Sequence, residues 1–240
     1  MKFKRYALSK LATIKYGKNQ KKVLSEDGNI PIYGTGGLMG YATTALYDKP
    51  SVLIGRKGTI GKVKYVEHPF WTVDTLFYTI INVDIVIPKY LYYVMSLIDL
   101  NNYNEGTTIP SLRTETLNRL EFDIPSIEEQ EIVLSCLNPI DRKIELNNAI
   151  NNNLQEQAQT LYTNMFIHNA SDQWAEGALS DVADITMGQS PKGDTYNEDG
   201  IGTVFFQGRG EFGFRFPTRR LFTTDPKRIA QSNDVLMSVR

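Results

Sequence analysis

The 240-residue chain has little of what disulfides and zinc sites are built from, with one cysteine and two histidines. Cys136 has no second cysteine with which to form a disulfide within the chain. His68 and His168 lie far apart and have no partners at zinc-ligand spacing. We therefore expect no metal site and no internal disulfide, and the reduced cysteine leads us to expect a cytoplasmic protein.

Long apolar runs are also absent. No stretch of about twenty apolar residues is present, so the sequence predicts no membrane span. The basic N-terminus, residues 1–6, is not followed by the apolar region and small-residue cleavage site of a secretory signal. With 41% hydrophobic and 22% charged residues, the composition is typical of a globular protein with one or two domains.

Catalytic motifs are scarce as well. The glycines of residues 34–40 lack dinucleotide-binding spacing, and Gly61-Lys62 precedes Val63 where a phosphate loop needs Ser or Thr. No serine lies in a nucleophile elbow, and the Asn-Pro-Pro-aromatic tetrad of amino-methyltransferases is missing. We found no convincing acidic nuclease cluster. We therefore expect no catalytic residue and disfavour an independent methyltransferase or nuclease.

Charge is distributed unevenly along the chain, although the net charge is only −1. Residues 1–65 contain 13 basic and three acidic residues, whereas residues 121–170 contain two basic and eight acidic ones. A lysine-rich segment is often simply a face exposed to water, without a binding role. A basic segment joined to an acidic one also suggests that one end binds a polyanion and the other a protein.

A long helical segment follows Pro125. Ser126 and Glu129 form the pattern of a capping box, which predicts a helix start. Because proline is unfavourable inside a helix and favourable at its first position, Asn138-Pro139 predicts two helices. We expect a short helix over residues 126–137 and a second over residues 138–166, roughly 40 Å long.

Apolar residues recur along this segment at alternating steps of three and four, with two asparagines near the middle. This heptad seam predicts a coiled-coil-type helical spacer that lies along another helix, and the alternative is an amphipathic core helix. We expect the partner or dimer interface to comprise Gln130, Val133, Leu137, Ile140, Ile144, Asn147, Asn151, Leu154, Ala158, Leu161 and Met165.

Before the spacer, the sequence alternates between short strand patterns and helical ones, which predicts an α+β domain with a mixed sheet. Residues 8–16 have helix or helix–strand character, a helix begins at Pro88, and residues 101–105 form a loop before a short helix. Strands are expected at residues 30–33, 51–54, 61–66, 70–73, 76–81 and 117–124.

After the spacer, the chain repeats its own opening. Residues 11–17 match residues 182–188, and residues 52–54 match residues 235–237. Arg240 falls near the position equivalent to Arg56, so we expect a truncated second copy. The predicted domains are residues 1–125, the helical spacer at residues 126–170, and a partial second domain at residues 171–240.

The basic glycine-rich loops of the first domain suit DNA. Backbone amides of glycine turns can approach phosphates closely, and arginine can read guanine in the major groove. Each loop taken alone could simply permit a tight turn between strands. The predicted DNA contacts are Lys18, Tyr33, Thr35, Gly36, Gly37, Tyr41, Arg56, Lys57, Lys62, Thr107, Thr108 and Ser111.

Several of these segments together resemble one protein family. Residues 124–133 and 141–147 resemble the conserved region of the DNA-specificity subunit of type I restriction–modification enzymes. The upstream segments at residues 30–34, 52–58 and 106–110 are similar to the family's target-recognition domains. The resemblance covers essentially the whole chain.

The resemblance implies a mechanism for reading DNA. Two target-recognition domains at opposite ends of a pair of antiparallel helices each read half of a split double-stranded DNA target. Methyltransferase subunits carrying S-adenosylmethionine dock on the helices, and the restriction subunit joins that complex. The specificity subunit itself has no active site and no cofactor, which agrees with the missing motifs.

This sequence departs from the family pattern because it has one complete and one partial recognition domain. We therefore expect two copies to pair in antiparallel sense through the seam over residues 140–165, with Asn147 and Asn151 fixing the register. The main alternative, from a different class, is a protein-interaction adaptor without DNA specificity.

Overall fold

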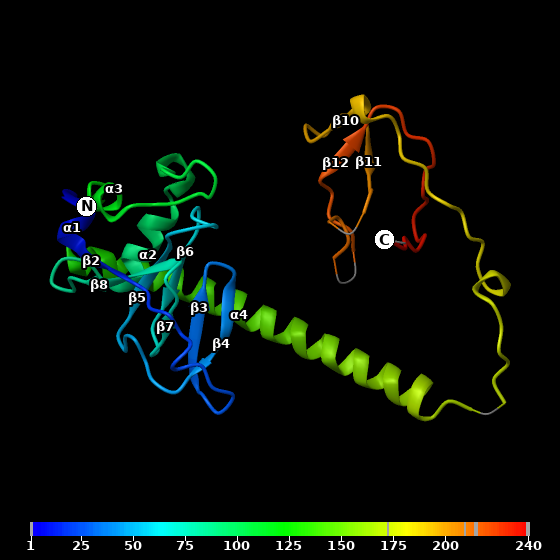
Figure 1. The fold of residues 1–240 in the computed structure, drawn as a ribbon, viewed down its shortest axis with the longest axis horizontal. Coiled ribbons are helices and arrows are strands. Elements are labelled where there is room, and N and C mark those ends of the chain that lie inside the picture. Colours follow the sequence, from blue (N-terminus) through cyan, green and yellow to red (C-terminus); the bar gives the residue numbers. More distant parts are fainter. Residues whose placement is uncertain (1, 172, 209, 214–215, 239–240) are drawn as a thin grey trace. The chain divides into compact units, whose positions relative to one another are not determined.

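The computed structural model describes residues 2–171, 173–208, 210–213 and 216–238 (Figure 1). The chain forms two compact units, Met1–Tyr162 and Thr163–Arg240. The division into three domains made from the sequence stays a prediction, because the structure groups most of the long helix with the first unit.

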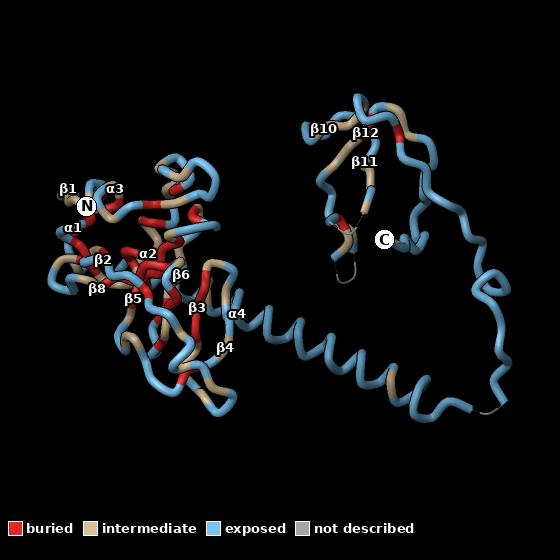
Figure 2. Tube along the Cα trace, in the orientation of Figure 1, coloured by how far each residue is buried: buried red, intermediate tan, exposed pale blue. Residues whose placement is uncertain are grey.

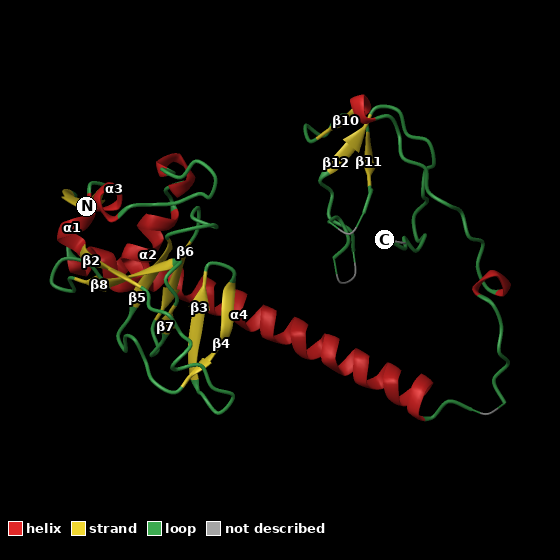
Figure 3. Cartoon of the chain, viewed as in Figure 1, coloured by secondary structure: helices red, strands yellow, loops and turns green. Residues whose placement is uncertain are grey.

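The first unit combines nine strands with four α-helices and a 3₁₀ turn, and the predicted α+β class is confirmed (Figure 3). Its strands are β1 (Lys4–Ala7), β2 (Ala12–Tyr16), β3 (Ile30–Gly34), β4 (Gly37–Ala42), β5 (Ser51–Gly55), β6 (Val63–Val66), β7 (Trp71–Thr72), β8 (Leu76–Ile81) and β9 (Glu121–Ile124). Its helices are α1 (Leu8–Leu11), α2 (Pro88–Ser96), η1 (Leu100–Tyr103), α3 (Thr114–Asn118) and α4 (Ile127–Thr163).

Two sheets organise this unit. The larger is antiparallel, in the order β2-β8-β5-β6, and the smaller has the order β4-β3-β7 with β3 parallel to β7. Strands β1 and β9 pair separately and bring the start of the chain to the segment before α4. Every residue of β5 is buried, and α2 packs against β5 and β6 with Leu91 and Met95 in the core. The buried residues concentrate in the strands and short helices that precede α4, which we call the globular part (Figure 2).

Three local predictions differ from the structure. The strand expected over residues 117–124 begins only at Glu121, because Leu117 belongs to α3. The loop expected at residues 101–105 is largely the 3₁₀ turn η1. Strand β4 forms where a glycine loop was expected: it pairs with β3 although Gly37 and Gly40 adopt positive φ angles (115° and 149°) that other residues avoid.

The prediction of two helices broken at Asn138-Pro139 is wrong, because α4 is a single helix with Pro139 inside it. Pro139 is exposed, so water can solvate the carbonyl group that loses its helical partner. The predicted capping box is present: the N–H of Ser126 donates to the Glu129 carboxylate (3.3 Å), and the N–H of Glu129 donates to Ser126 Oγ (3.4 Å). The π-helical turn η2 (Asn164–His168) follows α4.

The second unit contains the 3₁₀ turns η3 (Leu179–Asp181) and η4 (Gly193–Thr195), and a small antiparallel sheet in the order β10-β12-β11. Its strands are β10 (Tyr196–Asn197), β11 (Thr203–Phe205) and β12 (Leu221–Thr223).

This small sheet shares one hydrogen-bonding feature with the first unit. In one copy the N–H of Thr43 donates to the carbonyl of Val23 (3.0 Å), and in the other the N–H of Thr224 donates to Thr195 (3.2 Å). In both copies a hairpin, β3–β4 or β11–β12, is extended by pairing beside its second strand. The two small sheets nevertheless differ, because β3, the first strand of its hairpin, is central in one and β12, the second strand of its hairpin, is central in the other.

The repeat does not extend to the larger sheet. Residues 182–188 and 235–237, which match β2 and β5 in sequence, form no strand. In the first unit, β2 pairs with β8, and β5 pairs with β6 and β8. The partner strands β6 and β8 lie at residues 63–66 and 76–81 of the first unit.

Candidate nucleic-acid interface

Two loops that are distant in sequence form one surface at the end of β5. The N–H of Gly58 donates to the carbonyl oxygen of Pro110 (2.9 Å), and the N–H of Leu112 donates to that of Arg56 (2.9 Å). These bonds join the turn after β5 to the threonine-rich loop at residues 106–111. The two predicted DNA-contacting segments therefore lie side by side.

Three further predicted residues lie close to this joined pair. Lys57 and Ser111 form an isolated antiparallel bridge. Gly58 has a φ angle of 87°, and a Cβ atom there would stand 3.8 Å from Thr35 Oγ1, in the turn between β3 and β4. These contacts join three segments, and we call the predicted residues in them the loop surface: Thr35, Gly36, Gly37, Arg56, Lys57, Thr107, Thr108 and Ser111.

Arg56 is held at the base of this surface. Its Nη1 donates to the carbonyl oxygen of Asp74 (2.8 Å), and its guanidinium carbon lies 5.1 Å from the ring centroid of Tyr16. A planar guanidinium has five donors, so Arg56 keeps donors for a further ligand while its direction is fixed. Lys57, in contrast, is exposed and supplies charge.

Tyr33 does not belong to the loop surface, because its side chain lies in the core of the first unit and is only 8% exposed, and its role as a DNA contact stays a prediction. Its hydroxyl lies 3.3 Å from His68 Nε2, and burial raises the pKa of Tyr33. Lys64 Nζ lies 3.8 Å from the ring centroid, a cation–π contact. Sequence reasoning missed Lys64, and no sequence signal connects it to Tyr33.

The structure places three other predicted contacts without joining them to the loop surface. The backbone of Lys18 is fixed at β7: its N–H donates to Thr72 (2.8 Å) and its carbonyl accepts from Trp71 Nε1 (2.9 Å). Lys62 is exposed beside Gly61. Tyr41 is partly exposed on β4. Their role as DNA contacts stays a prediction.

The prediction that Gln130 contacts a partner is wrong, because its side chain is fully buried in the chain's own first unit. Its Nε2 donates to the carbonyl oxygens of Ile85 and Pro125 (both 3.0 Å), and its Oε1 accepts from the N–H of Ile87 (2.8 Å). Val133 likewise packs against the core of this unit. The heptad pattern did not reveal which neighbour covers these positions.

A second contact fixes the helix three turns later. Lys89 Nζ lies 2.9 Å from Asp141 Oδ2, and the Tyr93 hydroxyl donates to the same carboxylate. The Tyr93 hydrogen bond and, secondarily, Lys89 lower the pKa of Asp141, while burial and this carboxylate raise the pKa of Tyr93. Both partners lie on α2, so residues 127–141 of α4 are anchored to the globular part.

Beyond Asp141 the helix is exposed, and we call residues 142–162 its bare part in the sense of solvent exposure only. Residues 142–162 are all exposed, including the seam residues Ile144, Asn147, Asn151, Leu154, Ala158 and Leu161 (Figure 2). Ile140, just before Asp141, and Met165, in η2, are exposed too. Leu137 is half-buried.

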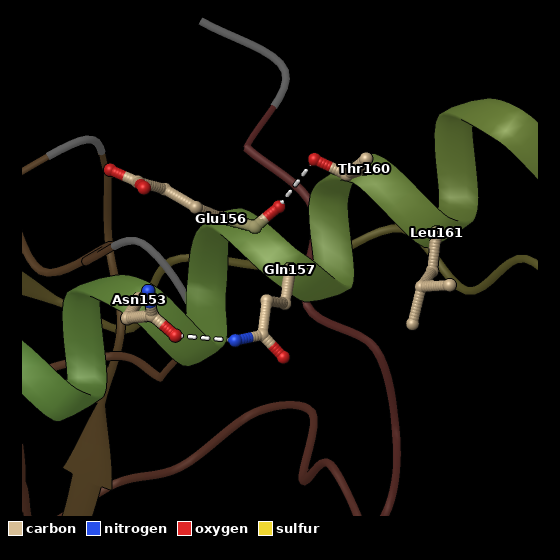
Figure 4. A pocket seen from close by; sticks show the side chains of 5 residues that line it. All are labelled: Asn153, Glu156, Gln157, Thr160 and Leu161. Atoms are coloured by element: carbon tan, nitrogen blue, oxygen red, sulfur yellow. Dashed lines mark hydrogen bonds between the residues drawn. The ribbon is translucent and has the colours of Figure 1, made fainter.

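The hollow drawn in Figure 4 belongs to this bare part. It is lined by Asn153, Glu156, Gln157, Thr160 and Leu161, all side chains of α4. Thr160 Oγ1 donates to the carbonyl oxygen of Glu156 (2.8 Å), and Gln157 donates to Asn153. Because a single helix supplies every lining residue, the hollow is a feature of the helix surface and not an enclosed ligand site.

Two absences hold for the part of the chain that the structure describes. No group of three or more His, Cys, Asp or Glu side chains could hold a metal ion there. In the same residues, no helix has both the length and the apolar character needed to cross a membrane.

Known proteins are similar to this chain in sequence and in fold. Over 186 residues (76% of this chain and 41% of the relative), the chain is 28% identical to the type I restriction enzyme MjaIX specificity subunit of Methanocaldococcus jannaschii. It is also 28% identical over 152 residues to the type I restriction enzyme HindI specificity subunit of Haemophilus influenzae, covering 58% of this chain and 33% of that protein. The matches thus span about two fifths or less of each relative's length.

A solved structure has the same fold: the S subunit of a type I restriction-modification system from M. genitalium, with a TM-score of 0.59 and 17% identity over 98% of this chain and 63% of that one. Residues 2–156 match the model of the family described as Type I restriction modification DNA specificity domain. This match covers the loop surface and most of α4, and the chain therefore belongs to the family of type I restriction modification DNA specificity domains.

Proposed function

We propose that this chain reads double-stranded DNA sequence-specifically, without chemistry of its own, as the specificity subunit of a type I restriction–modification complex or as a part of such a subunit. The observation that carries the proposal is the loop surface, in which three loops from distant parts of the first unit, two of them in its basic N-terminal segment, lie together. Its arginine, lysine and hydroxyl side chains are groups that bind phosphates and base edges.

Membership of a DNA specificity family supports this reading and does not favour the adaptor alternative. Arg56 suits a base contact, because its contacts with Asp74 and Tyr16 fix its direction and leave donors free to pair with guanine. Lys57 suits a phosphate contact, since it is an exposed point charge. The surface thus supplies both kinds of contact that sequence-specific DNA binding requires.

The partner subunits would supply the reaction. Methyltransferase subunits would dock on the bare part of α4 and bring S-adenosylmethionine with them, and the restriction subunit would join through that complex in the cytoplasm. The exposed seam supports this docking, because its apolar residues contact no core of the first unit. The anchors at Gln130 and Asp141 would hold the docked subunits in a fixed direction from the loop surface.

A second copy of the chain is the other partner that we propose for the seam. Antiparallel pairing through residues 140–165 would cover the exposed apolar residues and place Asn147 and Asn151 near the twofold axis. Sedimentation at micromolar protein, with and without DNA, tests this pairing. A dimer is expected, and a strict monomer under both conditions would contradict it.

Selection of bound fragments from random duplex DNA, with a methyltransferase partner present, tests the proposed function. We expect one enriched sequence, with an affinity that falls steeply as salt rises and a preference over a scrambled duplex that persists. Binding without any sequence preference, or no binding to DNA at all, would overturn the proposal in favour of the adaptor.

A further inference from the structure

The threonine-rich loop is held at its base by Asn104, a residue outside the predicted DNA contacts. Asn104 Oδ1 accepts from the N–H of Gly106 (2.9 Å) and from the N–H of Ser111 (2.9 Å). Its Nδ2 donates to the carbonyl oxygen of Gly106 (3.2 Å). One side chain therefore joins the first and last residues of the loop.

Neighbouring contacts close the same base. The N–H of Glu105 donates to the carbonyl oxygen of Ser111 (2.9 Å), so both backbone polar groups of Ser111 are paired at this point. The Glu105 carboxylate lies 3.1 Å from Arg113 Nε and accepts from the Thr116 hydroxyl, which ties the base to α3. The tip of the loop, residues 107–110, stays exposed.

The loop leaves no room for a side chain at Gly106. A Cβ atom on Gly106 would collide with the carbonyl oxygen of Ile109 and would approach Ser111 Oγ within 2.8 Å. The loop can take this shape only with glycine at its first position, because any side chain there must displace the backbone opposite. Its conformation therefore depends on Gly106 and on the bonds from Asn104.

The same loop is bonded to the turn at residues 56–58, which we call the arginine turn. Pro110 accepts from Gly58, Leu112 donates to Arg56, and Ser111 bridges to Lys57. The segment that Asn104 holds at Ser111 is thus the segment that bonds to residues 56–58. Releasing it would loosen the threonine loop and the arginine turn together.

We infer that Asn104 is a positioning residue for sequence recognition: it holds the threonine loop and the Arg56 turn as one rigid reading surface. The inference rests on the proposed function and deepens it, because it assigns specificity to a side chain that need not contact DNA. Preorganised groups lose less entropy on binding. Holding the loops rigid therefore raises the affinity for the specific sequence and does not change the sequence-independent attraction to phosphates.

Asn104→Ala in the full chain tests the inference, with Asn102→Ala as the matched control, since Asn102 is an exposed asparagine two residues away. On a duplex recovered by selection with the unaltered chain, Asn104→Ala should bind roughly tenfold more weakly, as expected for a loss of about 1.4 kcal/mol. Its binding to a scrambled duplex and its salt slope should not change, because no charge is removed. Asn102→Ala should match the unaltered chain in every assay.

Gly106→Ala separates positioning from direct contact, because it leaves Asn104 in place and displaces the loop. Gly106→Ala should also bind the selected duplex more weakly and should bind the scrambled duplex as the unaltered chain does. The inference is overturned if Gly106→Ala keeps full affinity for the selected duplex. It is also overturned if Asn104→Ala weakens binding to both duplexes equally, or weakens binding to neither.

Amide hydrogen exchange on the DNA-free chain gives a readout independent of the proposed function. In Asn104→Ala the amides of Gly106 and Ser111 should exchange faster, and so should that of Gly58, which has no bond to Asn104. Unchanged exchange at Gly58 would refute the coupling of the two loops. If exchange changes as expected but the unaltered chain selects no duplex, the proposed function has failed, and the role of Asn104 in recognition fails with it.

Discussion

The two parts of α4 have the same kind of apolar stripe and different surroundings. Along residues 127–141 the stripe packs on the globular part, where Leu134 is buried and Gln130 bonds to three backbone groups. Along residues 142–163 similar residues, such as Leu154, are exposed. A regular stripe therefore shows that a helix has an apolar face, but it does not show what covers that face.

This difference explains how one helix can serve two purposes. The anchored part fixes the direction of the helix relative to the loop surface, because Gln130 and Asp141 hold it at two points about three turns apart. Along residues 142–162, seam side chains such as Leu154 are exposed and can pack against another helix. Substitutions of one residue type in the two parts should therefore have different consequences.

The largest difference is expected for glutamine. Gln130→Ala leaves one buried and two partly buried backbone groups without partners, each costing about 1–3 kcal/mol, partly relieved by water. We expect the free energy of unfolding of the first unit to fall by about 4 kcal/mol in urea titrations followed by circular dichroism. Gln155→Ala, an exposed glutamine of the bare part, should change it by less than about 0.5 kcal/mol. Equal effects would show that the two parts do not differ in anchoring.

Leucine gives the next comparison. Leu134 is 6% exposed and Leu154 is 56% exposed. Leu134→Ala should lower the free energy of unfolding by about 3 kcal/mol, because it removes apolar contacts and leaves a cavity. Leu154→Ala should leave it within about 0.5 kcal/mol in dilute protein and should weaken self-association or methyltransferase docking. Sedimentation of both variants checks this, and unchanged association in Leu154→Ala would remove the seam from the interface.

A smaller effect is expected at the second anchor. Asp141→Asn keeps an acceptor for the Tyr93 hydroxyl but removes the charge that faces Lys89. The free energy of unfolding should fall by about 1 kcal/mol, as for a partly exposed charged hydrogen bond. Glu145→Gln, one turn later on the bare part, is the control and should have no measurable effect in the same titration.

The pH dependence of this anchor is the smallest effect. Because the pKa of Asp141 is lower in the folded chain than in the unfolded one, its contribution is present above the ordinary value near 3.9. It is lost as pH falls through the lower folded-state pKa. The stability difference between the unaltered chain and Asp141→Asn should therefore be constant near neutral pH and should shrink in acid. A difference that grows in acid would contradict the assigned direction.

Local sequence signals predicted much of the fold. The capping box at Ser126 and the helix beginning at Pro88 are both present, since each depends on residues within one helical turn. Strands β3, β5 and β8 also lie where apolar runs predicted them. The continuous helix through Pro139 was missed, because its solvent exposure, which lowers the cost of the lost bond, is a property of the tertiary structure.

The candidate site was predicted as separate pieces. Residues 55–58 are glycine-rich and residues 106–111 are threonine-rich, but the bond between Gly58 and Pro110 joins residues more than fifty positions apart. Asn104 was missed for a related reason, because its bonds serve the loop and leave no motif in the sequence. The burial of Tyr33 could not be predicted either, because it depends on contacts with residues distant in sequence, such as Lys64.

The salt dependence of DNA binding by Lys57→Ala tests the central claim most directly, namely that the loop surface of the first unit reads DNA. On the selected duplex, the plot of log affinity against log salt should be shallower than that of the unaltered chain by about 0.9, the value for one lost phosphate contact. The sequence preference should be retained, and Lys143→Ala on the bare helix should keep the full slope. An unchanged slope in Lys57→Ala together with a reduced one in Lys143→Ala would place the DNA on the helix and contradict the account.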